Sequence, residues 1–66
     1  MQIFLNDKKQ MTESGSTLAS LLRHTQGTTD GIAVIVNQQV ISKSQWVHHQ
    51  LTEGDRVTVF TAMAGG

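Results

Sequence analysis

The sequence contains no cysteine and no proline, and its aromatic residues are one tryptophan and two phenylalanines in 66 positions. Without cysteine the chain can form neither a disulfide nor a thiolate zinc site. It also has no thiol of its own that could carry sulfur, an acyl group or electrons. A domain below about 70–80 residues gains only about 3–5 kcal/mol from its core. We therefore expect one small domain, residues 1–66, held by the apolar 38% of the chain.

An excess of either charge is also missing, because five basic residues balance five acidic ones in a chain that is only 15% charged. Nucleic-acid-binding domains need clustered Lys and Arg, so nucleic acid is not an expected partner. No apolar run approaches the ~20 residues that span a bilayer. Residues 1–5 lack the charged start and cleavage site of a signal peptide. These absences predict a cytoplasmic domain with no membrane contact.

The first thirteen residues have the pattern of a β-hairpin. Met1, Ile3 and Leu5 alternate with other residues at the period of a strand. Asn6–Lys8 supplies the turn, because Asn and Asp tolerate left-handed conformations. A second strand is expected over residues 9–13, ending before Ser14-Gly15-Ser16.

Residues 16–27 predict the only convincing helix. Ser16 or Thr17 can cap its first amides, and Gly27 can end it in a left-handed conformation. Its apolar stripe consists of three leucines at i, i+3 and i+4: Leu18, Leu21 and Leu22. So short a helix is unstable alone in water, and it must therefore pack on a sheet.

Two segments after the helix predict a second hairpin and a long crossing. Ile32–Val36 is apolar on both faces, which favours an interior strand. Asn37–Gln39 turns the chain, and Val40–Ile41 forms a short return strand. Residues 42–55 then cross irregularly, with Trp46 and Leu51 as anchors in the core and Glu53–Asp55 as a turn.

The last strand is expected over residues 56–64, and its alternation separates two faces. One face carries Val57, Val59 and Thr61, and the other carries Thr58, Phe60 and Ala62. A hairpin, a helix and further strands predict an α+β domain: a mixed sheet of four to five strands with one main helix on one face. With the first and last strands parallel in the centre, Phe4 and Phe60 lie on the face away from the helix. We interpret Phe4, Phe60 and Ala62 as a candidate docking patch, since exposed apolar clusters mark partner sites.

Three stretches together resemble the ThiS family, small ubiquitin-like sulfur carriers of thiamine biosynthesis: "NQQVISKSQW", "LTEGDRVTVF" and the final "AGG". The resemblance covers the chain from Met1 to Gly66. Its most specific parts are the Asn37 turn with Val40, Ile41 and Trp46 after it, the Glu53–Val57 turn and the Gly65-Gly66 end. One departure is Ser42-Lys43, where many relatives have a proline and a basic residue, and we expect it to alter only a loop.

The resemblance implies a β-grasp fold and a role as a carrier, not as an enzyme. A ThiF-like adenylating enzyme would use ATP and magnesium to adenylate the carboxylate of Gly66, and the chain itself would bind no cofactor. Sulfur from a cysteine desulfurase would then replace AMP and leave a thiocarboxylate. Thiazole synthase (ThiG) would take that sulfur for the thiazole ring. The chain would contribute no catalytic residue and would be a monomer when free.

The small residues of the tail fit that chemistry. A carboxylate is a poor electrophile, so it must be activated before a sulfur nucleophile can attack its carbon. Glycine has no Cβ and takes backbone conformations closed to other residues. In this interpretation Gly66 is modified, while Gly65 and Ala64 form a thin lead into a partner's active site.

Other functions stay open at this point. Since glycine is about 7% of average composition, a Gly-Gly ending arises by chance about once in 200 chains. Within the resemblance, a MoaD-like carrier for molybdopterin synthesis is the nearest alternative, and a ubiquitin-like protein modifier is another. An interaction module with an inert tail is a third. His24, His48 and His49 suggest a metal site, but the last two are adjacent and no further ligand completes a zinc set.

Overall fold

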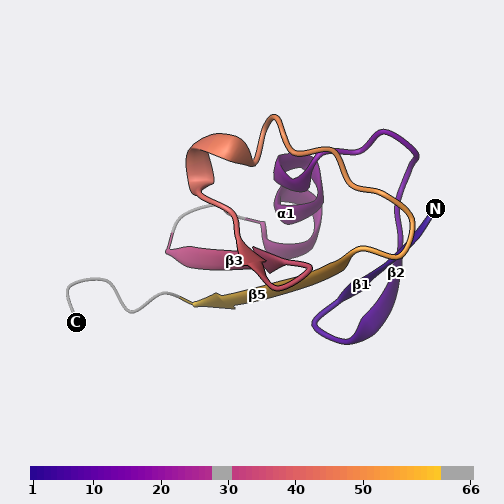
Figure 1. The fold of residues 1–66 in the computed structure, drawn as a ribbon, viewed down its shortest axis with the longest axis horizontal. Helices are drawn as coiled ribbons and strands as arrows, with labels where there is room; N and C mark the ends of the chain where they lie inside the picture. The colour runs from indigo at the N-terminus through magenta and orange to yellow at the C-terminus, as the bar shows by residue number, and fades with distance from the viewer. Residues whose placement is uncertain (28–30, 62–66) are drawn as a thin grey trace.

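The computed structural model describes residues 1–27 and 31–61, which form a five-stranded mixed sheet with an α-helix across one face (Figure 1). The elements in chain order are β1 (Gln2–Leu5), β2 (Lys8–Met11), α1 (Leu18–Gln26), β3 (Ile32–Val36), β4 (Gln39–Val40), the 3₁₀-helix η1 (Lys43–Gln45) and β5 (Arg56–Thr61). The strand order is β2-β1-β5-β3-β4, with β1 and β5 parallel and the other neighbours antiparallel. The predicted α+β layout with parallel central strands is confirmed.

The β1–β2 hairpin turns on two residues. Asn6 and Asp7 both have positive φ, 51° and 67°, which is the conformation that joins antiparallel strands most tightly. Leu5 therefore pairs with Lys8. The predicted three-residue turn and the second strand over residues 9–13 were wrong at their limits, because two residues that tolerate left-handed backbone suffice for the turn.

Helix α1 begins and ends as its sequence predicts. The Oγ1 of Thr17 accepts a hydrogen bond from the Ser20 amide at 3.2 Å, so Thr17 is the capping residue of the two candidates. Carbonyls of the crossing satisfy two further free amides of the first turn: His49 accepts from Leu18 at 2.8 Å, and Trp46 accepts from Ala19 at 3.1 Å. Gly27 ends the helix with φ 73°.

Strand β3 lies between β5 and β4, so the predicted interior position is confirmed. It turns at Asn37 and Gln38, which have φ of 49° and 71°. The return strand is Gln39–Val40, one residue earlier than the predicted Val40–Ile41. As in the first hairpin, the turn takes two residues where three were predicted.

The core lies between α1 and the sheet. Its ten buried apolar side chains come from β1, α1, β3, β5 and the crossing. They are Ile3, Leu18, Leu21, Leu22, Val34, Val36, Trp46, Leu51, Val57 and Val59. Trp46 and Leu51 are both buried, as predicted for the crossing. Trp46 also donates its Nε1–H to the Ile41 carbonyl at 2.9 Å, which fixes the crossing to the chain after β4.

No element of the described ranges covers the opposite face of the sheet (Figure 1). No helix in those ranges combines the length and hydropathy needed to cross a membrane. The uncovered face carries two of the residues for which the sequence predicts a docking role, and the candidate site is therefore built from it.

Candidate functional site

Strand register decides which side chains share the uncovered face. Val57 and Val59 of β5 are buried under α1, so the residues that alternate with them point to the other side. Directly paired residues of neighbouring strands share a face. The pairing then assigns ten residues to what we call the open face: Gln2, Phe4, Lys9, Met11, Ala33, Ile35, Val40, Arg56, Thr58 and Phe60.

Phe4 and Phe60 both lie on the open face, as predicted, but they are not neighbours. Phe4 pairs with Arg56, whereas Phe60 is four residues further along β5, a separation of about 13 Å along the strand. The Arg56 guanidinium carbon stands 4.8 Å from the centre of the Phe4 ring, a distance typical of a cation–π contact. Phe60 is 48% exposed.

Two exposed apolar members of the open face were missed from the sequence. Met11 is 68% exposed and Val40 is 77% exposed. Together with Phe60, they are three of the four large apolar side chains that stand exposed among the described residues; the fourth, Val47, lies in the crossing. The strand register could have found them, but it depended on turn lengths that were predicted one residue too long. The docking prediction for Phe4 and Phe60 itself stays a prediction.

The other residues predicted to act lie outside the described ranges. Gly66, Gly65, Ala64 and Ala62 all follow Thr61, where the described part of β5 ends. Thr61 pairs with Ile32, so the last described residue of β5 lies beside the start of β3. Phe60 is therefore the open-face residue nearest in sequence to the predicted reactive end.

A shallow hollow of about 300 Å³ opens on this face between the two hairpin turns, lined by Asp7, Ile35, Asn37, Gln38, Arg56 and Thr58. One side of it is held by hydrogen bonds between the second turn and β5. Asn37 accepts from the Arg56 amide at 3.0 Å through its Oδ1, and its own amide donates to the Arg56 carbonyl at 2.9 Å. The backbone of Arg56 is thus fixed from both directions.

Asp55 anchors this arrangement from inside the fold. Its carboxylate is buried and accepts from the Asn37 Nδ2 at 3.0 Å and from the Thr52 hydroxyl and amide, each at 2.8 Å. Burial by itself raises the pKa of Asp55. The backbone hydrogen bond from Thr52, the side-chain bonds from Asn37 and Thr52 and the charge of His49 together outweigh burial and lower that pKa below 3.8. Asp55 is therefore an ionised structural residue that sets the position of Asn37 and, through it, Arg56.

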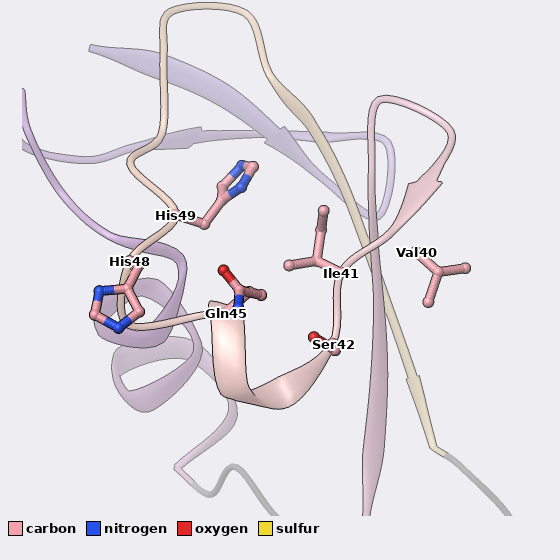
Figure 2. Close-up of a pocket in the computed structure, with 6 residues that line it drawn as sticks. All are labelled: Val40, Ile41, Ser42, Gln45, His48 and His49. Carbon is pink, nitrogen blue, oxygen red and sulfur yellow. The ribbon is translucent and has the colours of Figure 1, made fainter.

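A second hollow, of about 380 Å³, lies beside η1 and is lined by Val40, Ile41, Ser42, Gln45, His48 and His49 (Figure 2). Ile41 points into it, whereas Val40 points away, in agreement with the place of Val40 on the open face. His48 and His49 extend in different directions. Across the described residues, no three side chains of His, Cys, Asp or Glu gather to hold a metal.

Comparisons with known proteins agree on one family. The family model that matches residues 2–66 describes the ThiS family. The sulfur carrier protein ThiS of Escherichia coli K12 is 35% identical over 66 residues, which is the whole of both chains. The crystal structure of thiamine biosynthesis protein ThiS from Geobacter metallireducens has a TM-score of 0.87 over the whole of both chains. At 20% identity this likeness concerns the fold.

Proposed function

The chain belongs to the ThiS family, and from this membership we propose that it is a sulfur carrier protein of thiamine biosynthesis, acting in the cytoplasm and not itself an enzyme. Its fold is the ubiquitin-like β-grasp. The observation that carries the proposal is the match along the full length to the Escherichia coli sulfur carrier protein ThiS. The agreement of fold along the same length supports it.

The chemistry we propose takes place at the carboxylate of Gly66. A carboxylate oxygen attacks the α-phosphorus of ATP in the site of a ThiF-like adenylating enzyme, with magnesium present, and pyrophosphate leaves. The outer sulfur of a persulfide formed by a cysteine desulfurase then attacks the acyl carbon, and AMP leaves. A thiol cleaves the resulting acyl disulfide, which releases the thiocarboxylate and leaves a disulfide on the other two sulfur atoms. The resulting thiocarboxylate gives its sulfur to thiazole synthase.

The sequence supports a carrier that relies on its partners. The chain has no cysteine, so a thiocarboxylate is a way for it to hold transferable sulfur without a thiol. Gly65 and Ala64 carry little or no side chain, which suits a lead that must pass through a narrow opening. The partners supply activation and nucleophile, and the carrier supplies the acyl group.

The test is the intact mass of the protein after incubation with ATP, magnesium, a ThiF-type enzyme, a cysteine desulfurase and cysteine. We expect an increase equal to the replacement of one oxygen by sulfur. A chain lacking Gly66 should not show it. Transfer of the sulfur to thiazole synthase separates this function from molybdopterin supply, and an isopeptide adduct on other proteins would indicate a modifier instead. The proposal fails if folded protein and active partners give neither an adenylate nor a mass change.

We further propose that the open face docks on the adenylating enzyme. The Phe60→Ser variant should lower kcat/KM for adenylation about tenfold or more, because exposed aromatic side chains are frequent binding hot spots. Val47→Ser is the matched control, since Val47 is also exposed, at 59%, but lies in the crossing. Equal kinetics for the two variants, with both folded, would contradict docking through Phe60.

A further inference from the structure

The charged side chains of the open face have one sign. Lys9 and Arg56 are the charged members of this face, and both are exposed. Among the carboxylates of the described ranges, Asp7 is in the first turn and lines the hollow beside Arg56, whereas Glu13 follows β2, Glu53 is in the turn before β5, and Asp55 is buried. A chain with no net charge therefore presents cations on its uncovered sheet face.

The two cations stand on either side of one aromatic ring. Phe4 pairs with Lys9 on β2 and with Arg56 on β5, so the three residues form a single row across three strands. Neighbouring strands are about 4.8 Å apart, which places the two cationic residues about 10 Å from one another with Phe4 between them. We call these three residues the cationic row.

Arg56 is held in position by an aromatic ring and by hydrogen bonds to its backbone. Its guanidinium stacks on Phe4, and its backbone is fixed by Asn37. No carboxylate of residues 1–27 or 31–61 forms a salt bridge with it, although Asp7 lines the same hollow. A guanidinium stacked on a ring keeps its edge donors in the plane, where they can still meet a carboxylate.

Four apolar members of the open face lie further along β5, towards its end, whereas Met11 pairs with Gln2 on the other side of the cationic row. Val40 pairs with Ile35, which pairs with Thr58, and Phe60 pairs with Ala33. These two rows lie beyond the cationic row in the direction in which β5 leads to the tail. The open face thus has its cationic row between Met11 and the two apolar rows near the strand end, so a partner that covers this face meets charged and apolar side chains together.

We propose that the cationic row fits carboxylates on the surface of the adenylating enzyme, and that it selects and steers this partner. The inference rests on the proposed function, which supplies the partner. Complementary charges at the rim of an interface act mainly on the association rate and on its salt dependence. The apolar rows then provide contact area, while the tail enters the active site.

The test measures the association rate with the ThiF-type enzyme at about 0.05 M and at about 0.5 M NaCl. The higher concentration shortens the screening length to a few Å. At low salt, Arg56→Gln and Lys9→Gln should each slow association about two- to fivefold, the range expected for an exposed ion pair. The double variant should show the product of the two effects if they are independent. Arg56→Lys, which keeps the charge, should retain the salt dependence. All differences should vanish at high salt.

Arg23→Gln is the matched control. Arg23 is exposed on α1, the element that covers the other face of the sheet, and its loss changes the net charge by the same amount. Circular dichroism checks that each variant is folded, and Lys9→Gln changes only an exposed residue of an edge strand. The inference is overturned if association of the wild type does not slow with salt, or if the Lys9 and Arg56 variants match Arg23→Gln.

Failure of this inference and failure of the proposed function give different results. If the wild type is adenylated but the cationic row has no effect on association, only the inference is wrong. If the wild type is not adenylated at all, the proposed function is wrong, and the inference falls with it.

Discussion

At the scale of single residues, the buried carboxylate of Asp55 links the fold to the candidate site. It accepts hydrogen bonds from Thr52 and from Asn37, and Asn37 in turn holds the backbone of Arg56. The Asp55 carbonyl also accepts from the Phe4 amide at 2.8 Å. Asp55 therefore helps to place both members of the Phe4–Arg56 stack, Arg56 through its carboxylate and Asn37, and Phe4 through its backbone carbonyl.

The Asp55→Asn variant should lower the free energy of unfolding by about 1–3 kcal/mol, because one acceptor oxygen is replaced by a donor that faces other donors. The pKa of Asp55 is lowered by folding. Its stabilising contribution is therefore complete above the unfolded pKa, near 3.8, and is lost as the pH falls through the lower folded value. The variant should thus lose less stability than the wild type on acidification below about pH 4.

Urea unfolding at about pH 7 and below about pH 4 measures both effects. Asp7→Asn is the control, because Asp7 is exposed and asparagine also tolerates its left-handed backbone. The interpretation of Asp55 is wrong if Asp55→Asn and Asp7→Asn unfold alike at both pH values.

At the scale of elements, the two hairpins turn on residues that are not glycine. Asn6, Asp7 and Asn37 have side chains that tolerate the left-handed region, but Gln38, at φ 71°, does not share that preference. The β3–β4 turn is held by the bonds of Asn37 to Asp55 and Arg56. Tertiary contacts therefore impose a conformation that Gln38 would not choose alone.

The Gln38→Gly variant should raise the free energy of unfolding by about 0.5–1 kcal/mol. Relief of the left-handed conformation is worth about 1–2 kcal/mol, and the greater freedom of glycine in the unfolded chain offsets part of it. Gln39→Gly is the matched control, since Gln39 lies in β4, and it should be destabilising. Thermal unfolding of the two variants compares them directly. A loss of stability in both would show that the turn is not strained.

The limits of the sequence prediction follow from the same turns. Apolar alternation predicted β1 and β5, the continuous apolar run predicted β3, and the capping candidates Ser16 and Thr17 together with Gly27 predicted the ends of α1, because these signals are local. The two turns are held by distant contacts: Asn37 meets Asp55 and Arg56, which are 18 and 19 residues away, and Asn6 accepts from the Val59 amide, 53 residues away. No local pattern contains those contacts, and an error of one residue at a turn reverses the face of every residue in the strand that pairs across that turn.

The open face shows the consequence for the candidate site. Phe4 and Phe60 could be placed on it from alternation within their own strands. Met11, Val40 and Lys9 could not, because their positions depend on pairing across turns. The stack of Arg56 on Phe4 requires the parallel pairing of β1 with β5, the two ends of the described chain.

At the scale of the whole molecule, one small core must support a sheet whose other face stays exposed. The helix, the crossing and one face of the sheet meet around ten buried apolar side chains. The single core of a domain of this size supplies a free energy of unfolding of only about 3–5 kcal/mol. The apolar residues of the open face therefore add little to stability until a partner covers them, and the fold depends on the anchors of its single core.

Trp46 is the largest of these anchors, and Trp46→Ala should unfold most of the protein at room temperature. Loss of a buried tryptophan costs about 3–5 kcal/mol. This is as large as the free energy of unfolding expected for the whole domain. Trp46→Phe should stay folded but lose about 1–3 kcal/mol, because the Ile41 carbonyl loses its bond from Nε1. Far-ultraviolet circular dichroism follows both variants during heating, since removal of the only tryptophan abolishes its fluorescence. A cooperative transition of Trp46→Ala near the wild-type midpoint would mean that the crossing is held by its backbone bonds to α1 and not by this side chain.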